Sequence, residues 1–467
     1  MKIRKERSDL NLHFIGVGGI GMSGIAQVFL NQGFRVSGSD LADSDTSRRL
    51  EQLGLRFHVG HSSDHVRDAD VVVVSSAVKS DNPEVLEARR RHIPVIPRAE
   101  MLGELMRGKC GIAIAGTHGK TTTTSMLATV LTAAHWDPTM VIGGKVDSLG
   151  GNAKLGQGEF VVAEADESDG SFLHLPATYS VITNIDNDHL DHYGSLKAID
   201  DAFAEFVAKI PFYGLAAVCA EDSGVRRNLS RFIKPFVTYG FSDQWDYSAF
   251  DLVSEAFGSR FQVRHRVDGN LGEVTLQVPG RHNVLNALAV VAICRALQMP
   301  FSQIASGLAQ YCGVKRRFEI RWRDERSKQM IVDDYGHHPT EIEATLAAAR
   351  QVWKGRLVVV FQPHRYTRTL HCRDGFMRAF HDADVVLLTD IYGAGESPIE
   401  GVSSEALADE MRRVARSDQQ IHHVGNLAGA TSEVLRRFQQ GDLVLCMGAG
   451  TITKLPDELM KHLVIST

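Results

Sequence analysis

Short apolar runs alternate with helical stretches along most of the chain. Residues 71–74 are four consecutive valines, as expected for a parallel strand that is buried on both faces. Residues 111–115 and 357–361 are comparable runs, and each precedes a stretch of helical character. Alternating strands and helices indicate a parallel α/β sheet.

The alternation falls into three consecutive cycles, so we predict three α/β domains at residues 1–107, 108–313 and 314–467. The length of 467 residues agrees with this number, because a domain typically has roughly 150 residues. Between about residues 246 and 278 apolar and polar residues alternate without a helix, which predicts an antiparallel addition to the central sheet.

Composition and charge exclude several classes of protein. Lys and Arg number 51 against 56 Asp and Glu, a net charge of −5, and a nucleic-acid binder usually shows a basic excess. No apolar run approaches the length of a membrane span, so we expect no membrane insertion. The charged N-terminus has no apolar signal core behind it, and the six cysteines are scattered. We therefore expect a cytoplasmic protein with reduced thiols.

The first glycine-rich turn has the pattern G-x-G-x-x-G at residues 16–21. Its glycines would let the backbone approach a pyrophosphate at a helix N-terminus. Asp40 closes the next predicted strand, where a ribose hydroxyl would lie. This pattern alone does not distinguish NAD from another diphosphate, and a tight turn without a ligand remains an alternative.

The second turn, residues 116–121, reads G-T-H-G-K-T and is shorter than a standard P-loop. Backbone N–H groups of such a turn cradle phosphates. Lys120 would supply a positive charge to the outer phosphates, and the Thr121 hydroxyl would face Mg²⁺.

Carboxylates for a metal site follow a neighbouring apolar strand. Glu164 comes directly after this strand and is the best Mg²⁺ candidate, whereas Asp166, Glu167 and Asp169 either take part or form an exposed acidic loop. His189 follows another strand end in a polar loop. It would be a second metal ligand or a structural histidine, since Mg²⁺ prefers oxygen ligands.

Together, seven ordered motifs of the chain resemble the Mur ligase family, in its alanine-adding branch. The resemblance extends from about residue 14 to residue 452. It rests on residues 16–24, 116–122, 164–169, 280–286, 315–319, 333–340 and 361–368.

The resemblance implies a UDP-sugar-binding Rossmann-like domain, a central P-loop-type ATP-binding domain and a C-terminal Rossmann-like α/β domain that binds the amino acid and closes over the site. It implies ATP-dependent joining of L-alanine to the lactyl carboxylate of UDP-N-acetylmuramate through an acyl phosphate. The product would serve peptidoglycan synthesis, and with it cell-wall formation, cell shape and cell division. We expect a monomer or a homodimer.

The resemblance also implies roles for individual residues. Those expected to bind ATP are Gly116, Thr117, His118, Gly119, Lys120, Thr121, Thr122, His282, Asn286, Arg317 and Asp334. Those expected to hold Mg²⁺ are Thr121, Glu164 and His189.

Further positions match the two other substrates. Those expected near the UDP-sugar are Gly18, Gly19, Ile20, Asp40, His61, Ser75 and Ser76. Those expected near alanine and the acyl phosphate are Tyr335, His337, Arg365 and Arg368. The residues expected to act in catalysis are Lys120, Glu164, His189, His337 and Arg365.

The chemistry of these side chains leaves some roles open. His337 would take the proton of the alanine amine, or it would only bind or pack. Arg365 and Arg368 suit a carboxylate or a phosphate, which guanidinium binds bidentately; the alternative is a solvated loop. Relatives with other amino-acid substrates use a carbamylated lysine where we align Phe203, so we expect no carbamate.

Three rival functions remain to be weighed. A nicotinamide-dependent oxidoreductase would leave Lys120 and Glu164 without a role. A nucleotide-binding switch would not need the arginines and histidines of the third cycle. A recycling ligase of the same family would attach a preformed peptide to the same sugar, and the motif at residues 361–368 does not exclude it.

Overall fold

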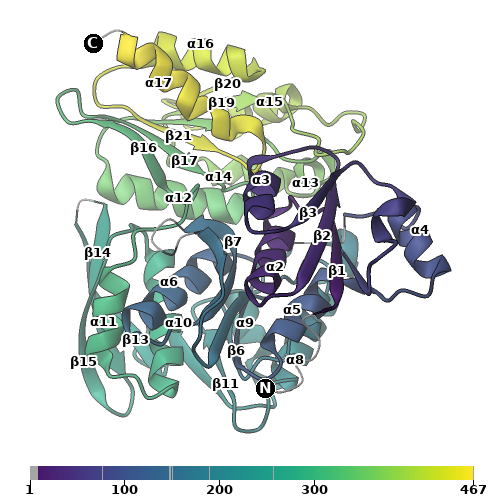
Figure 1. Cartoon of the computed structure of the whole chain (residues 1–467). Coiled ribbons are helices and arrows are strands. Elements are labelled where there is room, and N and C mark those ends of the chain that lie inside the picture. Colours follow the sequence, from purple (N-terminus) through teal and green to yellow (C-terminus); the bar gives the residue numbers. More distant parts are fainter. Residues whose placement is uncertain are drawn as a thin grey trace. The chain divides into compact units, whose positions relative to one another are not determined.

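The computed structural model describes residues 9–75, 77–146, 149, 151–188, 190–255 and 257–465, arranged as α/β elements around three sheets (Figure 1). The chain divides into two compact units. The first unit comprises Met1–Leu252, Phe261–Thr275 and Val284–Cys312, and the second comprises Val253–Arg260, Leu276–Asn283 and Gly313–Thr467.

The first sheet has five parallel strands in the order β3-β2-β1-β4-β5. Its chain order reverses between β1 and β4, where a doubly wound sheet opens a crevice at the carboxyl ends of its strands. The strands are β1 (Asn11–Ile15), β2 (Arg35–Asp40), β3 (Arg56–Val59), β4 (Val71–Val74) and β5 (Val95–Pro97). The helices are α2 (Ile20–Asn31), α3 (Asp45–Gln52), α4 (Pro83–Arg90), α5 (Arg98–Met106) and the 3-10 helix η1 (Ser63–Val66).

The central sheet has ten strands in the order β15-β14-β13-β12-β11-β10-β6-β9-β7-β8. The strands from β13 to β7 in this order pair in parallel, and β8 is antiparallel to β7. Its strands are β6 (Cys110–Ala115), β7 (Thr139–Val146), β8 (Gly151–Lys154), β9 (Phe160–Glu164), β10 (Tyr179–Ile182), β11 (Leu215–Cys219), β12 (Phe236–Gly240), β13 (Tyr247–Glu255), β14 (Gly258–His265) and β15 (Gly269–Leu276).

The neighbours β13, β14 and β15 confirm the predicted addition without helices. Connections this short can join only antiparallel strands, because a parallel pair needs a long crossover. The helices of this region are α6 (Lys120–Ala133), η3 (Ser171–His174), α7 (Leu190–Tyr193), α8 (Leu196–Ala208), α9 (Ser223–Asn228), η4 (Leu229–Arg231), α10 (Arg281–Ala296) and α11 (Phe301–Ala309).

The third sheet, in the second unit, has the order β16-β17-β21-β18-β19-β20. Only its edge strand β16 is antiparallel. The strands are β16 (Glu319–Asp324), β17 (Gln329–Asp334), β18 (Leu357–Phe361), β19 (Val385–Thr389), β20 (Gln420–Gly425) and β21 (Leu443–Met447). The helices are α12 (Pro339–Val352), α13 (Tyr366–His371), α14 (Arg373–Ala379), α15 (Ser404–Val414), α16 (Leu427–Arg437), η5 (Thr451–Lys454) and α17 (Leu455–Ile465).

The predicted α/β class with a mixed central sheet is confirmed. The inner strands β18, β19 and β21 are buried at every residue, which explains their unbroken apolar sequences. The exact boundaries at residues 107 and 313 stay a prediction. No helix among the described residues has the length and apolar character needed to cross a bilayer.

Candidate functional site

The predicted phosphate loop connects the end of β6 to the start of α6. Gly116 has φ +127°, and a Cβ added there would lie 2.1 Å from Thr183 Oγ1, so only glycine fits. Asn184 fastens the loop from the neighbouring strand end: its Oδ1 accepts from the His118 amide at 2.8 Å, and its Nδ2 donates to the His118 carbonyl at 2.9 Å. The loop is thus preformed at a helix N-terminus, the ordinary place for a bound phosphate.

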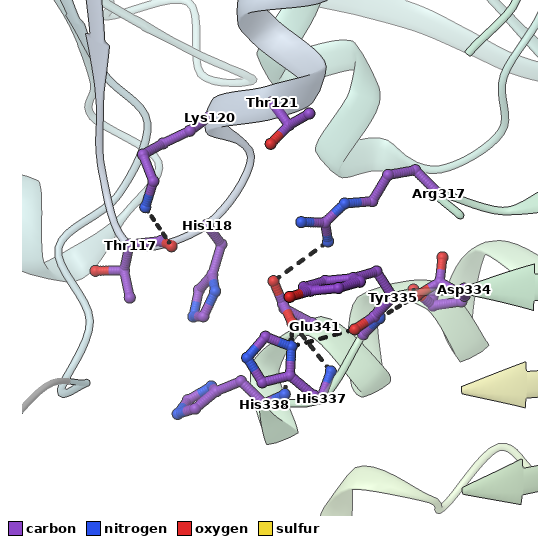
Figure 2. Close-up of polar contacts among 12 residues, drawn as sticks. Thr117, His118, Lys120, Thr121, Arg317, Asp334, Tyr335, His337, His338 and Glu341 are labelled. Atoms are coloured by element: carbon purple, nitrogen blue, oxygen red, sulfur yellow. Dashed lines mark hydrogen bonds and ion pairs between the residues drawn. The ribbon is translucent and has the colours of Figure 1, made fainter. Parts of the chain in front are cut away.

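Lys120 begins α6 and folds back over this loop. Its Nζ donates to the Thr117 carbonyl at 3.1 Å (Figure 2) and to the Gly116 carbonyl at 2.7 Å, and it lies 2.7 and 2.9 Å from the two carboxylate oxygens of Glu167. An ammonium has three donors, and here four acceptors surround it. To contact a nucleotide phosphate, Lys120 must therefore exchange at least one of these partners.

Glu167 is the partner that sequence reasoning did not assign. Its side chain is 2% exposed, so the exposed-loop alternative does not hold for it. Burial raises the pKa of Glu167 to about 7, although the charge of Lys120 opposes that rise. The signal in the sequence was only its place in an acidic run, and the contact with Lys120 depends on how the end of β9 meets the phosphate loop.

The two described candidates for the metal site touch each other. Thr121 Oγ1 donates to Glu164 Oε2 at 3.2 Å, and the Gly143 amide donates to Glu164 Oε1 at 2.6 Å. Burial raises the pKa of Glu164, opposed by the Gly143 amide and the charge of Lys120. The third candidate, His189, lies outside the described residues.

The acidic segment after β9 also reaches the first sheet. Asp166 Oδ2 accepts from Arg98 Nη2 at 3.1 Å. Arg98 lines a cavity together with Ser75, Asp169 and His174. Residues at the carboxyl ends of the first sheet therefore share one cavity with the segment that carries Glu164.

The first glycine-rich loop is hydrogen-bonded to Asp40, which ends β2. Asp40 Oδ2 accepts from the Gly18 amide at 2.8 Å, and Gly19 is the N-cap residue of α2. The side chain of Ile20 is exposed. Ser75 follows β4 and lies beside Gly16, and Ser76 lies outside the described residues. A contact of these residues with a sugar nucleotide stays a prediction.

In the second unit, Arg317 lies in a strained segment. Its neighbours Arg316 and Phe318 have φ of 60° and 52°, a left-handed conformation that costs a non-glycine residue about 1–3 kcal/mol. Asp334 holds the segment in place: its Oδ2 accepts from the Phe318 amide and its Oδ1 from the Gly336 amide, both at 2.8 Å. Burial raises the pKa of Asp334 to about 6. The structure thus gives Asp334 a positioning role, and its predicted contact with ribose stays untested.

Glu341, which sequence reasoning missed, links Arg317 to His337 (Figure 2). Its Oε1 lies 3.4 Å from Arg317 Nη1, and its Oε2 accepts from the His337 amide at 3.1 Å. A glutamate three residues after the helix N-cap, in His338-Pro339-Thr340-Glu341, was the available signal, because this position caps helices.

His337 is held as a neutral imidazole. Its Nδ1 lies 3.1 Å from the Tyr335 carbonyl, which only accepts, so Nδ1 carries a hydrogen. Burial lowers the pKa of His337 to about 3, although Glu341 opposes that change. The guanidinium of Arg317 lies 5.2 Å from the ring centroid of Tyr335.

Four further predicted residues lie at a helix end or within helices, namely Arg365, Arg368, His282 and Asn286. Arg365 is exposed and has φ 67°, and its amide donates to the Tyr392 carbonyl at 2.8 Å. Arg368 lies on α13. His282 and Asn286 lie on α10, and Asn286 is buried with its Oδ1 next to Gly119. Within the first unit the structure therefore brings together the phosphate loop, Glu164 and Asn286.

Three family models match the chain in order. They are the Mur ligase family catalytic domain at residues 11–110, the Mur ligase middle domain at residues 114–294 and the Mur ligase glutamate ligase domain at residues 316–450. The chain belongs to the Mur ligase family, as its motifs indicated.

Curated relatives of the chain within this family share one name. The UDP-N-acetylmuramate–L-alanine ligase of Geotalea daltonii is 54% identical over 97% of this chain and 98% of its own length. The ligase of the same name from Geobacter sulfurreducens is 57% identical, over 94% of this chain and 95% of its own.

Solved structures agree with this class. The UDP-N-acetylmuramate–alanine ligase of Thermotoga maritima superposes with a TM-score of 0.83 at 32% identity, covering 98% of this chain and all of that one. A murein peptide ligase from Psychrobacter arcticus has a TM-score of 0.71 at 24% identity, which shows a shared fold alone.

Proposed function

We propose that this chain joins L-alanine to the lactyl carboxylate of UDP-N-acetylmuramate and converts ATP to ADP and phosphate. The observation that carries the proposal is the identity of 54–57% to ligases of this activity over nearly the whole chain. The intact Gly116–Thr122 loop, with Thr121 against Glu164, supplies the parts that an ATP-dependent ligase needs. The product is a precursor for peptidoglycan.

The reaction has two balanced steps. A carboxylate oxygen of the lactyl group attacks the γ-phosphorus of ATP, and ADP leaves, which forms an acyl phosphate. The amine of alanine then attacks the acyl carbon and loses a proton, and inorganic phosphate leaves. The first step brings anions together, so positive charge must be preorganised around the phosphates. We assign this role to Lys120, with Arg317 as the second candidate.

We propose that Thr121 and Glu164 hold Mg²⁺ with the nucleotide. The two oxygens already lie 3.2 Å apart at the edge of the phosphate loop, and hydroxyl and carboxylate oxygens are the donors that Mg²⁺ prefers. When bound, the ion would neutralise charge on the phosphates. His189 stays a candidate ligand.

For His337 we propose a binding role rather than that of the general base. A base works best with a pKa near the operating pH, and burial holds the pKa of His337 at about 3. Its neutral ring instead offers Nε2 as an acceptor for the ammonium of alanine.

An ADP-release assay tests the proposed function. We expect ADP only when UDP-N-acetylmuramate and L-alanine are both present. Lys120→Ala should lower kcat at least 100-fold and leave the affinity for UDP-N-acetylmuramate within twofold. Lys154→Ala, which removes a half-exposed lysine paired with Asp137, is the matched control and should keep full activity. ADP release that does not depend on alanine would contradict the proposal.

The recycling ligase is the alternative closest in chemistry. Alanine and a preformed tripeptide, offered as competing acceptors, separate the two functions, and we expect at least a 100-fold preference for alanine in kcat/KM. We also propose a cytoplasmic location, since ATP and the sugar nucleotide are found there, and a monomer or homodimer, which light scattering would determine.

A further inference from the structure

A glutamate is fully buried on one face of the first sheet. Glu84, in the first turn of α4, has a side-chain exposure of 0%. It lies where α4 and η1 cover the sheet, a layer that also buries Val66, Val72 and Val85. A buried carboxylate needs compensating partners, and here they are a serine and several histidines.

Four side chains surround this carboxylate. Ser39 Oγ donates to Glu84 Oε2 at 2.7 Å, and His61 Nδ1 lies 3.1 Å from the same oxygen. His65 Nδ1 lies 2.6 Å from Oε1. His13 Nε2 is 3.7 Å from Oε1, too far for a hydrogen bond, and has no other hydrogen-bond partner among the described residues. Burial by itself raises the pKa of Glu84, but the facing His13, Ser39 and His65 lower it to about 2, so the carboxylate is ionised.

The oxygens that face His61 determine which of its ring nitrogens carries the hydrogen. The ionised carboxylate of Glu84 can only accept, and Ser39 gives its single hydroxyl proton to Glu84. His61 Nδ1 lies 3.1 Å from both Glu84 Oε2 and Ser39 Oγ. Because neither oxygen has a proton to offer, the hydrogen must be on Nδ1. In the neutral ring, Nε2 is then the acceptor.

His61 lies at the edge of the sheet where ligands bind. It comes two residues after the end of β3, and the Gly60 amide donates to the Asp40 carbonyl at 2.7 Å. Asp40 in turn accepts from Gly18 of the glycine loop. Ligands of doubly wound sheets bind at the carboxyl ends of the strands, and the His61 side chain, which follows the end of such a strand, is 19% exposed.

We propose that Glu84 is a positioning residue for the sugar nucleotide, because it holds His61 as the Nδ1–H tautomer with Nε2 directed at a hydrogen-bond donor of the ligand. This inference rests on the proposed function, which supplies UDP-N-acetylmuramate as that ligand. A purely structural role would instead make the cluster a stabiliser of the layer formed by α4 and η1.

A double-mutant cycle on the full chain separates these roles. We expect Glu84→Gln to raise the Kd for UDP-N-acetylmuramate about tenfold in calorimetry and to leave the Kd for ATP within twofold. The amide of glutamine removes the charge and offers a donor to Nδ1, so the His61 tautomer is no longer fixed. In a His61→Gln background the same substitution should change the Kd less than twofold, because the residue it positions is gone. Glu87→Gln, on the same helix but paired with Arg90 and Arg91, is the control and should leave both affinities unchanged.

The wild-type protein gives a second, independent readout. In ¹⁵N-histidine NMR, with the His61 signals assigned from His61→Gln, we expect the shifts of a ring protonated at Nδ1. This measurement tests the tautomer, on which the inference depends, even if Glu84→Gln does not fold. An Nε2–H tautomer, or equal losses from Glu84→Gln in both backgrounds, would overturn the inference while the proposed function stands. A wild-type chain that does not bind UDP-N-acetylmuramate would overturn both.

Discussion

At the scale of single residues, the protonation of Glu167 connects stability to pH. Burial raises its pKa to about 7, so the folded state holds the proton more tightly than the unfolded state. Such a group contributes stability that is fully present below its unfolded pKa and is lost as the pH rises through the folded pKa. The expected window runs from about pH 4.5 to 7.

Glu167→Gln should flatten this dependence. We expect urea unfolding of the nucleotide-free protein to show the wild type losing up to about 1.4 kcal/mol per pH unit across the window relative to the variant. Asp166→Asn is the matched control, because burial raises the pKa of Asp166 but the charges of Lys120 and Arg98 lower it overall. The contribution of Asp166 to the free energy of unfolding therefore has the opposite sign and is lost as the pH falls. Parallel pH profiles for wild type and Glu167→Gln would refute the assignment.

At the scale of elements, the strands that the sequence revealed are those with continuous apolar runs. The four valines of β4 and the fully buried strands β18, β19 and β21 were predictable at their exact bounds. The edge strands β16 and β20 could not be predicted in this way, because one face of an edge strand stays polar and their sequences, EIRWRD and QIHHVG, carry no apolar run.

The candidate site likewise has parts that could be predicted from the sequence and parts that could not. The loops that carry Lys120, Arg317 and their neighbours have motifs of their own and could be found from the sequence. The contacts of Glu167 and Glu341 could not, because each depends on where another segment of the fold places its partner. Of the metal candidates, the sequence supplied Thr121 and Glu164, but it did not show that they touch.

The conformation of the phosphate loop depends on the absence of a side chain at Gly116. Gly116→Ala places a Cβ 2.1 Å from Thr183 Oγ1 at a φ of +127°, so the loop must move. We expect the Kd for ATP to rise at least tenfold and stability to fall by about 2–4 kcal/mol. Gly108→Ala is the matched control, since Gly108 also has positive φ, +78°, but its Cβ would meet nothing within 4 Å. That variant should cost about 1 kcal/mol and leave ATP affinity unchanged; equal effects of the two would show that crowding at Gly116 is unimportant.

At the scale of the whole molecule, the distribution of cores differs from the division into three domains. One continuous cluster of buried residues includes Phe14 of the first sheet and Phe203 of α8 beside the central sheet. The second unit has its own clusters, which include Leu346 and Val360. The first two α/β cycles therefore share a core and form one compact unit, which the strand–helix alternation does not reveal, since it counts cycles and not the contacts between them.

This distribution predicts two units of local stability, which hydrogen–deuterium exchange can resolve. Leu346→Ala and Phe203→Ala each remove a fully buried side chain, at a cost of about 2–5 kcal/mol. We expect Leu346→Ala to speed amide exchange in β17, β18 and β21 and to leave β1 and β6 protected, because local opening follows the cooperative unit. Phe203→Ala should do the reverse, and β1 should lose protection together with β6 although the two strands belong to different α/β cycles. Amide exchange that rises throughout the chain in both variants would mean that the molecule is a single cooperative unit. Protection of β1 in Phe203→Ala would mean that it has three cooperative units.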